Sequence, residues 1–198
     1  MRRAWQRAGI AMVAVPLGMI LGAGDAAAFV SDRSWEVGVY VFNAALDNDS
    51  LIEDVPGFGL RGAYYVKAQH AIQVEIDSGT GDHRNPEDDP ALEDVEFDVL
   101  KYSVAYMHSH FIKGHEKVVV ESTYGVGRIN VDRDDLGDDT ATFFLIGAGF
   151  KYRTTPNSGF KFKAQIYEWR GDGQVTPRDG FFSFDVTFGW SWFFGGTE

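Results

Sequence analysis

The stretch from Phe181 to Phe194, FFSFDVTFGWSWFF, constrains the fold more than any other part of the chain. Its even positions carry large apolar side chains throughout, from Phe182 to Phe194. Its odd positions from Ser183 to Ser191 carry small or polar side chains. Successive side chains of a strand point to opposite faces, so one face of this strand is a wall of large rings. Lipid favours such a wall, so the stretch is predicted to be a membrane-facing strand.

The N-terminus has the layout of a secretory signal peptide. Three arginines lie among the first seven residues, and an apolar stretch over residues 9–22 follows, interrupted by Pro16. Small residues at 26–28 offer a cleavage site before Phe29. The apolar stretch is too short and too broken for a transmembrane helix. We therefore expect residues 1–28 to be a signal peptide that directs export.

Charge and composition exclude several classes of function. Without residues 1–28 the chain has 15 basic and 28 acidic residues, a net charge of −13. Nucleic acid is a poor partner for such a chain. The absence of cysteine excludes a disulfide framework and thiolate metal chemistry. Residues 29–198 have the size of one domain and contain no apolar run of helix length, so a closed barrel is the remaining way to span a membrane.

Alternation like that of the last strand recurs along the chain. The run over residues 95–108 begins out of phase, because Phe97 and Val99 fall on the polar parity, and a bulge near Val99 or Leu100 is expected. Eight strands are predicted in all: Trp35–Asn43, Phe58–Val66, His70–Gly79, Val95–His108, Lys117–Ile129, Thr140–Tyr152, Gly159–Arg170 and Phe181–Phe194.

The connections between these runs alternate between short and long. The short ones are residues 67–69, 109–116 and 153–158, and the long ones are 44–57, 80–94, 130–139 and 171–180. Outer-membrane barrels have short periplasmic turns and long extracellular loops. The pattern predicts an all-β fold, an eight-stranded antiparallel up-and-down transmembrane β-barrel with both termini in the periplasm.

A soluble eight-stranded barrel of the lipocalin type is the alternative. It would place the aromatic face inside and the charges outside. An eight-stranded barrel is only wide enough for side chains to fill it. The small side chains of the polar face fit such a lumen better than the large rings, so the membrane interpretation is favoured.

The end of the last strand carries a recognisable motif. The pattern polar–x–Gly–x–x–aromatic–x–aromatic occurs as Thr187, Gly189, Trp192 and Phe194. It is similar to the C-terminal signal that the outer-membrane assembly machinery reads. The strand pattern of the whole mature chain resembles the small eight-stranded barrels of the OmpA and OmpX type. The resemblance implies an integral bacterial outer-membrane protein in contact with outer-membrane lipid and lipopolysaccharide.

The face predicted to line the lumen carries charges of both signs. Glu121 and Asp185 lie on strands that flank three lysines, and we predict them as the partners of Lys151, Lys161 and Lys163. The simpler interpretation is a salt-bridged plug, and the alternative is a narrow gated pore. The predicted inward charges are Glu36, Arg61, Glu75, Asp77, Lys101, Glu121, Lys151, Lys161, Lys163 and Asp185.

The long connections are acidic. Clustered carboxylates can bind Ca²⁺ or Mg²⁺, but a solvated surface is the simpler interpretation. Glu168 has the outward parity, which is tolerable only near the membrane interface. We expect a monomer. The acidic residues are Asp47, Asp49, Glu53, Asp54, Asp82, Glu87, Asp88, Asp89, Glu93, Asp94, Asp132, Asp134, Asp135, Asp138 and Asp139.

Candidate catalytic chemistry is sparse. His108 and Ser109 are the local pair that a lipid A-modifying, deacylase-like enzyme could use, but they lie in a predicted periplasmic turn. A metal site formed by His108, His110 and His115 is a weaker alternative, because their spacing fixes no geometry. We therefore expect no catalytic residue, metal or cofactor. The predicted role is envelope-structural, or surface interaction through the acidic loops, with the enzyme and the small pore as alternatives.

Overall fold

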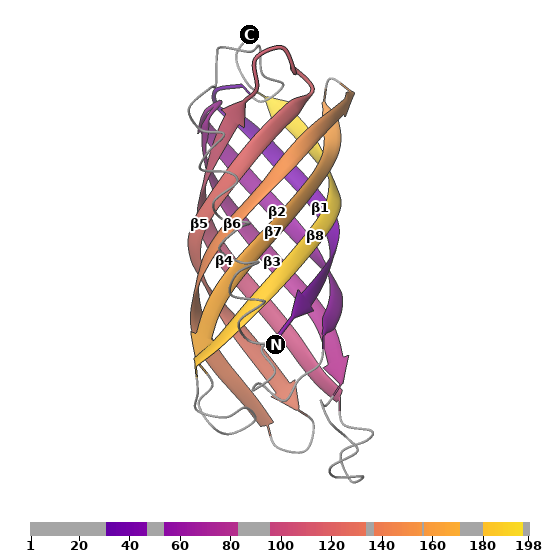
Figure 1. The fold of residues 1–198 in the computed structure, drawn as a ribbon, viewed down its shortest axis with the longest axis vertical. Coiled ribbons are helices and arrows are strands. Elements are labelled where there is room, and N and C mark those ends of the chain that lie inside the picture. Colours follow the sequence, from indigo (N-terminus) through magenta and orange to yellow (C-terminus); the bar gives the residue numbers. More distant parts are fainter. Residues whose placement is uncertain are drawn as a thin grey trace.

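A computed structural model of the chain describes residues 31–46, 54–82, 96–133, 137–155, 157–170 and 180–195. These residues form β1 (Ser34–Ala45), β2 (Val55–Lys67), β3 (His70–Asp82), β4 (Glu96–Phe111), β5 (Val118–Arg133), β6 (Gly137–Thr155), β7 (Ser158–Arg170) and β8 (Gly180–Gly195). Each strand pairs antiparallel with its sequence neighbours, and β8 pairs with β1 to close the barrel (Figure 1). The predicted fold class is confirmed. The described residues include no helix with the length and apolar character needed to cross a membrane.

The up-and-down topology gives the barrel two different ends. The turn end is where residues 68–69, 112–117 and 156–157 connect the strands. The loop end is where the remaining connections lie, between β1 and β2, β3 and β4, β5 and β6, and β7 and β8. Most of the predicted acidic loop residues lie outside the described residues. The predicted signal peptide also lies outside them.

The predicted long connection over residues 130–139 is wrong. β5 and β6 continue pairing as far as Arg133 and Gly137. Val131 is fully buried on the inner face, and Thr140 donates a hydrogen bond of 3.0 Å to the Asn130 side chain on the other face. The ladder is therefore stabilised on both sides even where the sequence is rich in aspartate. Only residues 134–136 separate the two strands.

The apolar and polar residues that alternate in the sequence point alternately to the outer and inner faces of the barrel wall. In β1, for example, every side chain from Ser34 to Ala44 alternates between buried and exposed positions. Exposed large hydrophobic side chains come from all eight strands, for example Val41, Phe58, Phe144 and Phe182. An outer surface of this kind is stable in lipid rather than in water. The wall is therefore a transmembrane wall.

The expected bulge near Val99 or Leu100 is absent from β4. The β3–β4 and β4–β5 registers run without a shift through this part of the strand. Phe97 and Val99 instead lie on the inner face, 1 % and 3 % exposed. These two apolar residues have the inward parity of β4, unlike the lipid-facing residues, because the lumen near the loop end is itself apolar.

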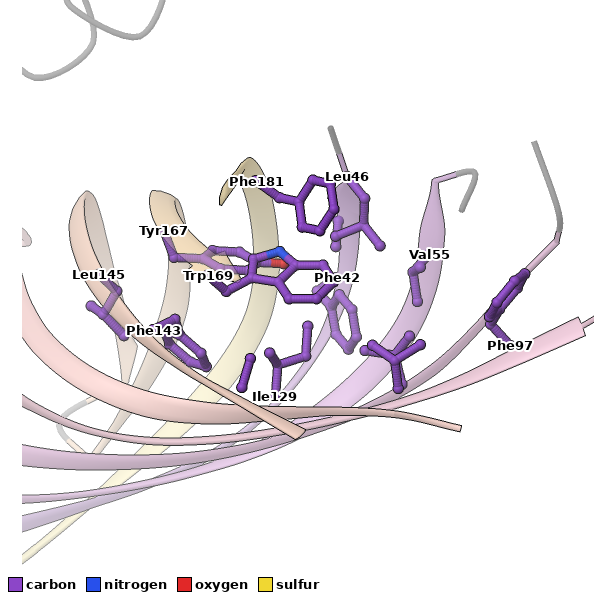
Figure 2. Close-up of a cluster of buried hydrophobic side chains, with 14 of the residues drawn as sticks. Phe42, Leu46, Val55, Phe97, Ile129, Phe143, Leu145, Tyr167, Trp169 and Phe181 are labelled. Atoms are coloured by element: carbon purple, nitrogen blue, oxygen red, sulfur yellow. The ribbon is translucent and has the colours of Figure 1, made fainter. Parts of the chain in front are cut away.

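Two apolar clusters fill the two ends of the lumen. The loop-end cluster includes large rings such as Phe42, Phe143 and Trp169, which project to the inside of the barrel (Figure 2). The expectation that mainly small side chains line the lumen is therefore wrong at this end. The turn-end cluster consists of Ala63, Tyr65, Ala71, Met107, Phe111, Val119 and Phe193.

Glycines on neighbouring strands make room for these rings. Gly127 lies opposite Phe143 in the β5–β6 ladder, and a Cβ at position 127 would overlap with the Phe143 ring. The Phe143 ring thus occupies the volume that a side chain at position 127 would need, and the Phe42 ring does the same at position 57. At these positions the narrow lumen accepts a large ring because its neighbour is a glycine.

Candidate functional site

The middle of the lumen contains ten charged side chains, five cationic and five anionic, which we call the lumen charge network. All ten predicted inward charges belong to it, and each is at most 4 % exposed. Alternation places them there, because each has the inward parity of its strand. The members are Glu36, Arg61, Glu75, Asp77, Lys101, Glu121, Lys151, Lys161, Lys163 and Asp185.

The part of the network nearest the turn end is centred on two lysines. Lys151 forms ion pairs with both Glu36 and Glu121. Lys161 lies 2.7 Å from Glu121 and 3.9 Å from Glu36, measured between the charged atoms, and it donates a hydrogen bond of 3.0 Å to Gln73. Each lysine is thus shared between the same two carboxylates. Tyr65 and Ser191 donate further hydrogen bonds to Glu36, of 2.6 and 2.7 Å.

The middle of the network is centred on Arg61. Its guanidinium lies 3.6 Å from Glu36 and 3.5 Å from Glu75. These separations are ion-pair contacts rather than hydrogen bonds. Glu75 in turn accepts a hydrogen bond from Lys163. Arg61 therefore links the carboxylate shared by Lys151 and Lys161 to the carboxylate bound by Lys163.

The part nearest the loop end is centred on Lys101. It forms an ion pair with Asp185 and lies 3.5 Å from Asp77. Tyr40 donates a hydrogen bond to Asp77, and Gln165 donates one of 3.1 Å to Asp185. The two carboxylates are thus held by groups from different strands.

Each end of the network is capped by aromatic rings. Lys151 lies over the rings of Tyr65 and Phe193 in the turn-end cluster. Lys101 lies over the rings of Phe42 and Tyr167 in the loop-end cluster. The charges are therefore enclosed between two apolar layers, and charges so enclosed are stable only when they are paired.

The predicted partners of the lysines are partly different in the structure. Glu121 contacts Lys151 and Lys161. Asp185 contacts Lys101 instead of these lysines, and Lys163 pairs with Glu75. These pairs cannot be predicted from which strands are neighbours, because the side chains meet across the lumen. The tilt of the strands sets the position of each side chain along the barrel axis.

The sequence pair His108 and Ser109 does not form a catalytic dyad. Ser109 is fully buried on the inner side, and its backbone N–H donates a hydrogen bond of 2.8 Å to the Gln69 carbonyl. His108 has the opposite parity and lies on the outer surface beside His70. His110 has the same outward parity as His108 but is only 6 % exposed, and it contacts the buried Ser122 hydroxyl at 3.3 Å.

Histidines from two strands meet on the outer surface at the turn end. The ring centroids of His70 and His108 are 4.8 Å apart, and those of His108 and His110 are 4.3 Å apart. His115 lies in the turn over residues 112–117. Within the described residues, no group of three or more histidine, aspartate or glutamate side chains is arranged to hold a metal ion. The sequence alone does not show that His70 lies beside His108, because only the β3–β4 register brings the two residues together.

The residues of the proposed assembly motif occupy both faces of β8. Thr187 is buried in the lumen, and Gly189 lies opposite Tyr40. Trp192 and Phe194 are 41 % and 55 % exposed on the outer surface. The two aromatic positions are therefore accessible from the lipid side, while the polar and glycine positions pack inside. Recognition of the motif stays a prediction.

Solved structures share this architecture, although no protein-family model and no curated protein sequence matches the chain. Neisserial surface protein A is 11 % identical over 80 % of this chain and 95 % of that protein, with a TM-score of 0.58. The outer-membrane protein OprG from Pseudomonas aeruginosa is 9 % identical over 84 % and 98 %, with a TM-score of 0.56. The outer-membrane protein AlkL is 14 % identical over 89 % and 97 %, with a TM-score of 0.57.

These likenesses extend over nearly the whole of each compared barrel. At such low identity they establish the shared fold and leave activity and partners open. Together with the closed eight-stranded sheet and its apolar outer surface, they identify the chain as a protein with the fold of the small eight-stranded outer-membrane β-barrels.

Proposed function

We propose that this protein is a non-enzymatic, non-conducting barrel of the bacterial outer membrane, which carries acidic connections at its extracellular end. The observation that supports the proposal best is the filling of the lumen. Ten balanced charges lie between two apolar clusters. A path for ions would need continuous water through both clusters, and buried rings such as Trp169 and Tyr65 occupy that space.

Orientation follows from the connections. In outer-membrane barrels the short turns are periplasmic and the longer loops are extracellular. The turn end is then periplasmic and the loop end extracellular. The four connections at the loop end would be presented to the medium on a rigid wall, which is where variable binding function resides in such scaffolds.

Charge selects the class of surface partner. The lumen charge network is balanced, so the net charge of −13 of the mature chain lies outside it. An acidic loop end attracts cations and cationic segments and repels polyanions. Solved barrels of this fold include the Yersinia pestis attachment invasion locus protein, which was determined with a heparin analogue. For the present chain we propose the opposite preference, for basic partners or divalent cations.

Membrane integration and channel activity test the scaffold proposal. We expect the protein in the outer-membrane fraction, with a gel band that shifts on boiling. In planar lipid bilayers we expect no regular single-channel steps. Regular steps that change with Lys161→Glu, but not with Lys117→Glu on the exposed turn, would contradict the closed lumen. A soluble protein without a shift on boiling would contradict the membrane assignment.

Surface preference needs a separate measurement. Folded protein in detergent micelles is passed over immobilised polylysine and over immobilised heparin at physiological salt. We expect retention on polylysine alone, and weaker retention when Glu87, Asp88 and Asp89 are replaced by their amides. Retention on heparin would overturn the proposed class of partner.

A lipid-modifying enzyme remains the alternative function. No observation in the described residues favours it over the scaffold, because His108 and Ser109 lie on opposite faces of β4. Loss of lipid A modification on His108→Ala would nevertheless reveal such an activity.

A further inference from the structure

Two histidines face one another on the outer surface of the barrel at the turn end. His70 is the first residue of β3, and the β3–β4 register places it directly opposite His108. Side chains in such a cross-strand pair start about 4.5–5.5 Å apart at their Cβ atoms. Tyr106 has the same outward parity two residues earlier in β4 and is 40 % exposed. Three side chains with lone pairs therefore converge at one place.

One nitrogen or oxygen of each of the three side chains lies within 3.4 Å of the other two. The Nδ1 atoms of His70 and His108 are 3.4 Å apart. The Tyr106 hydroxyl oxygen lies 2.5 Å from the His70 Nδ1 and 3.4 Å from the His108 Nδ1. Two imidazoles bound to one tetrahedral ion at about 2.0–2.1 Å have their nitrogens about 3.4 Å apart. A single ion can thus reach both nitrogens without a change in the backbone.

We propose that His70, His108 and Tyr106 form a binding site for a divalent transition-metal ion. The two Nδ1 atoms would be the principal ligands, and water would complete the coordination. The Tyr106 oxygen, 2.5 Å from the His70 Nδ1, is closer than two ligands of one tetrahedral ion, so it would become a third ligand only after its ring turns away from His70. Imidazole ligands suit Zn²⁺, Ni²⁺ and Cu²⁺, and the 3.4 Å separation matches the tetrahedral geometry of Zn²⁺. Cu²⁺ binds most tightly in this series and, although it prefers tetragonal coordination, serves as the detectable probe. The ligand set of two imidazoles and a phenol differs from the three-histidine alternative that the sequence suggested.

Neighbouring residues orient the site without entering it. The His110 ring lies edge-on to the His108 ring, with centroids 4.3 Å apart. Its Nε2 atom lies 3.3 Å from the Ser122 hydroxyl. His110 therefore packs against the His108 ring while its own polar contact points to β5. We expect it to fix the rotamer of His108 rather than to bind the ion.

Access to the site from water is provided by its place at the end of the wall. His70 directly follows the turn at Ala68 and Gln69, so it lies at the boundary of the apolar belt. The orientation toward the periplasm rests on the proposed function. Metal binding itself does not depend on that orientation, because it can be measured on the folded barrel in micelles.

Copper titration of the folded protein tests the site. Cu²⁺ is followed by isothermal titration calorimetry and by electron paramagnetic resonance, which detects coupling to imidazole nitrogen. We expect one ion per barrel with two coupled nitrogens. Loss of a residue that only hydrogen-bonds to a metal ligand typically weakens binding by about 10–100-fold. His70→Ala and His108→Ala remove a ligand itself, so each should weaken copper binding by at least that factor. Tyr106→Phe should weaken it less and leave both nitrogens coupled.

Control variants separate this site from other histidines. The controls are His115→Ala and His83→Ala. His115 lies in the exposed turn, and His83 lies outside the described residues. Neither should change the affinity. All variants are first checked for the shift on boiling, which reports a folded barrel independently of metal. Folded His70→Ala and His108→Ala barrels that bind copper like the unchanged protein would overturn the site. Absence of binding to the unchanged folded barrel at millimolar copper would also overturn it.

Discussion

Gly189 lies directly opposite Tyr40 in the ladder that closes the barrel. A Cβ at position 189 would overlap with the Val39 carbonyl oxygen and with the Tyr40 backbone and Cβ. The Tyr40 hydroxyl is fixed by its hydrogen bond to Asp77. Gly189 therefore has a packing role in addition to its place in the proposed assembly motif.

Gly189→Ala is expected to destabilise the folded barrel by about 1–3 kcal/mol, the usual cost of overpacking a well-filled interior. Backbone atoms of β1 cannot move away without loss of the β1–β8 pairing. The measurement is the free energy of unfolding in urea, with the protein in micelles. Gly62→Ala is the matched control, since a Cβ there meets nothing within 4 Å. Equal stability of the two variants would contradict the packing role.

The pair of Lys163 and Glu75 allows a double-mutant cycle. Glu75→Gln leaves Lys163 without its carboxylate and should cost about 3–5 kcal/mol, whereas Lys163→Met leaves Glu75 in contact with Arg61 at 3.5 Å and should cost less. The double variant should cost less than the sum of the two, because the remaining charge is then also absent. Unfolding free energies of the four proteins provide the cycle. Simple additivity would show that the ion pair contributes nothing.

Tryptophan fluorescence distinguishes the two faces of the wall. Trp169 is 2 % exposed, and its ring nitrogen donates a hydrogen bond of 3.0 Å to Ser183 inside the barrel. Trp192 is 41 % exposed on the outer surface. Variants that retain one tryptophan each are reconstituted in brominated phospholipid. We expect strong quenching of Trp192 and weak quenching of Trp169. The reverse result would place the aromatic wall inside a soluble barrel.

Three aspartates form a row across the loop end. Asp98 pairs in register with Asp132, which pairs with Asp138 on the next strand. Like charges directly opposite one another destabilise a ladder by about 0.2–1 kcal/mol. Asp132→Asn should therefore raise the melting temperature slightly at low salt, and the gain should fall as salt screens the row. An unchanged melting temperature at low salt would show that the carboxylates do not repel.

The sequence predicted the eight strands and their faces because one solvent, lipid, covers one face of every strand. Under that condition apolar residues recur at every second position in each of the eight strands. The pattern failed where the lumen is itself apolar. At Phe97 and Val99 it suggested a bulge, although both residues point inward in a regular strand.

The lumen charges were assigned to the correct face, but their pairing was only partly predictable. Lys163 and Glu75 are separated by 88 residues and meet across the interior. Their contact depends on strand tilt, which a single strand's pattern does not contain. For the same reason the pairing of His70 with His108 required the register of two neighbouring strands.

The origin of the network charges has a consequence for how the protein enters the membrane. Each of the eight strands contributes at least one member, from Glu36 on β1 to Asp185 on β8. The β7–β8 hairpin inserted alone would carry Lys161 and Lys163 into hydrocarbon without Glu121 of β5 and Glu75 of β3, at a cost of several kcal/mol for each. Stepwise insertion of hairpins is therefore disfavoured. The lysines of β7 meet these carboxylates only when β7 faces β3 and β5 across the lumen, so we expect closure and insertion of the sheet to form one cooperative event.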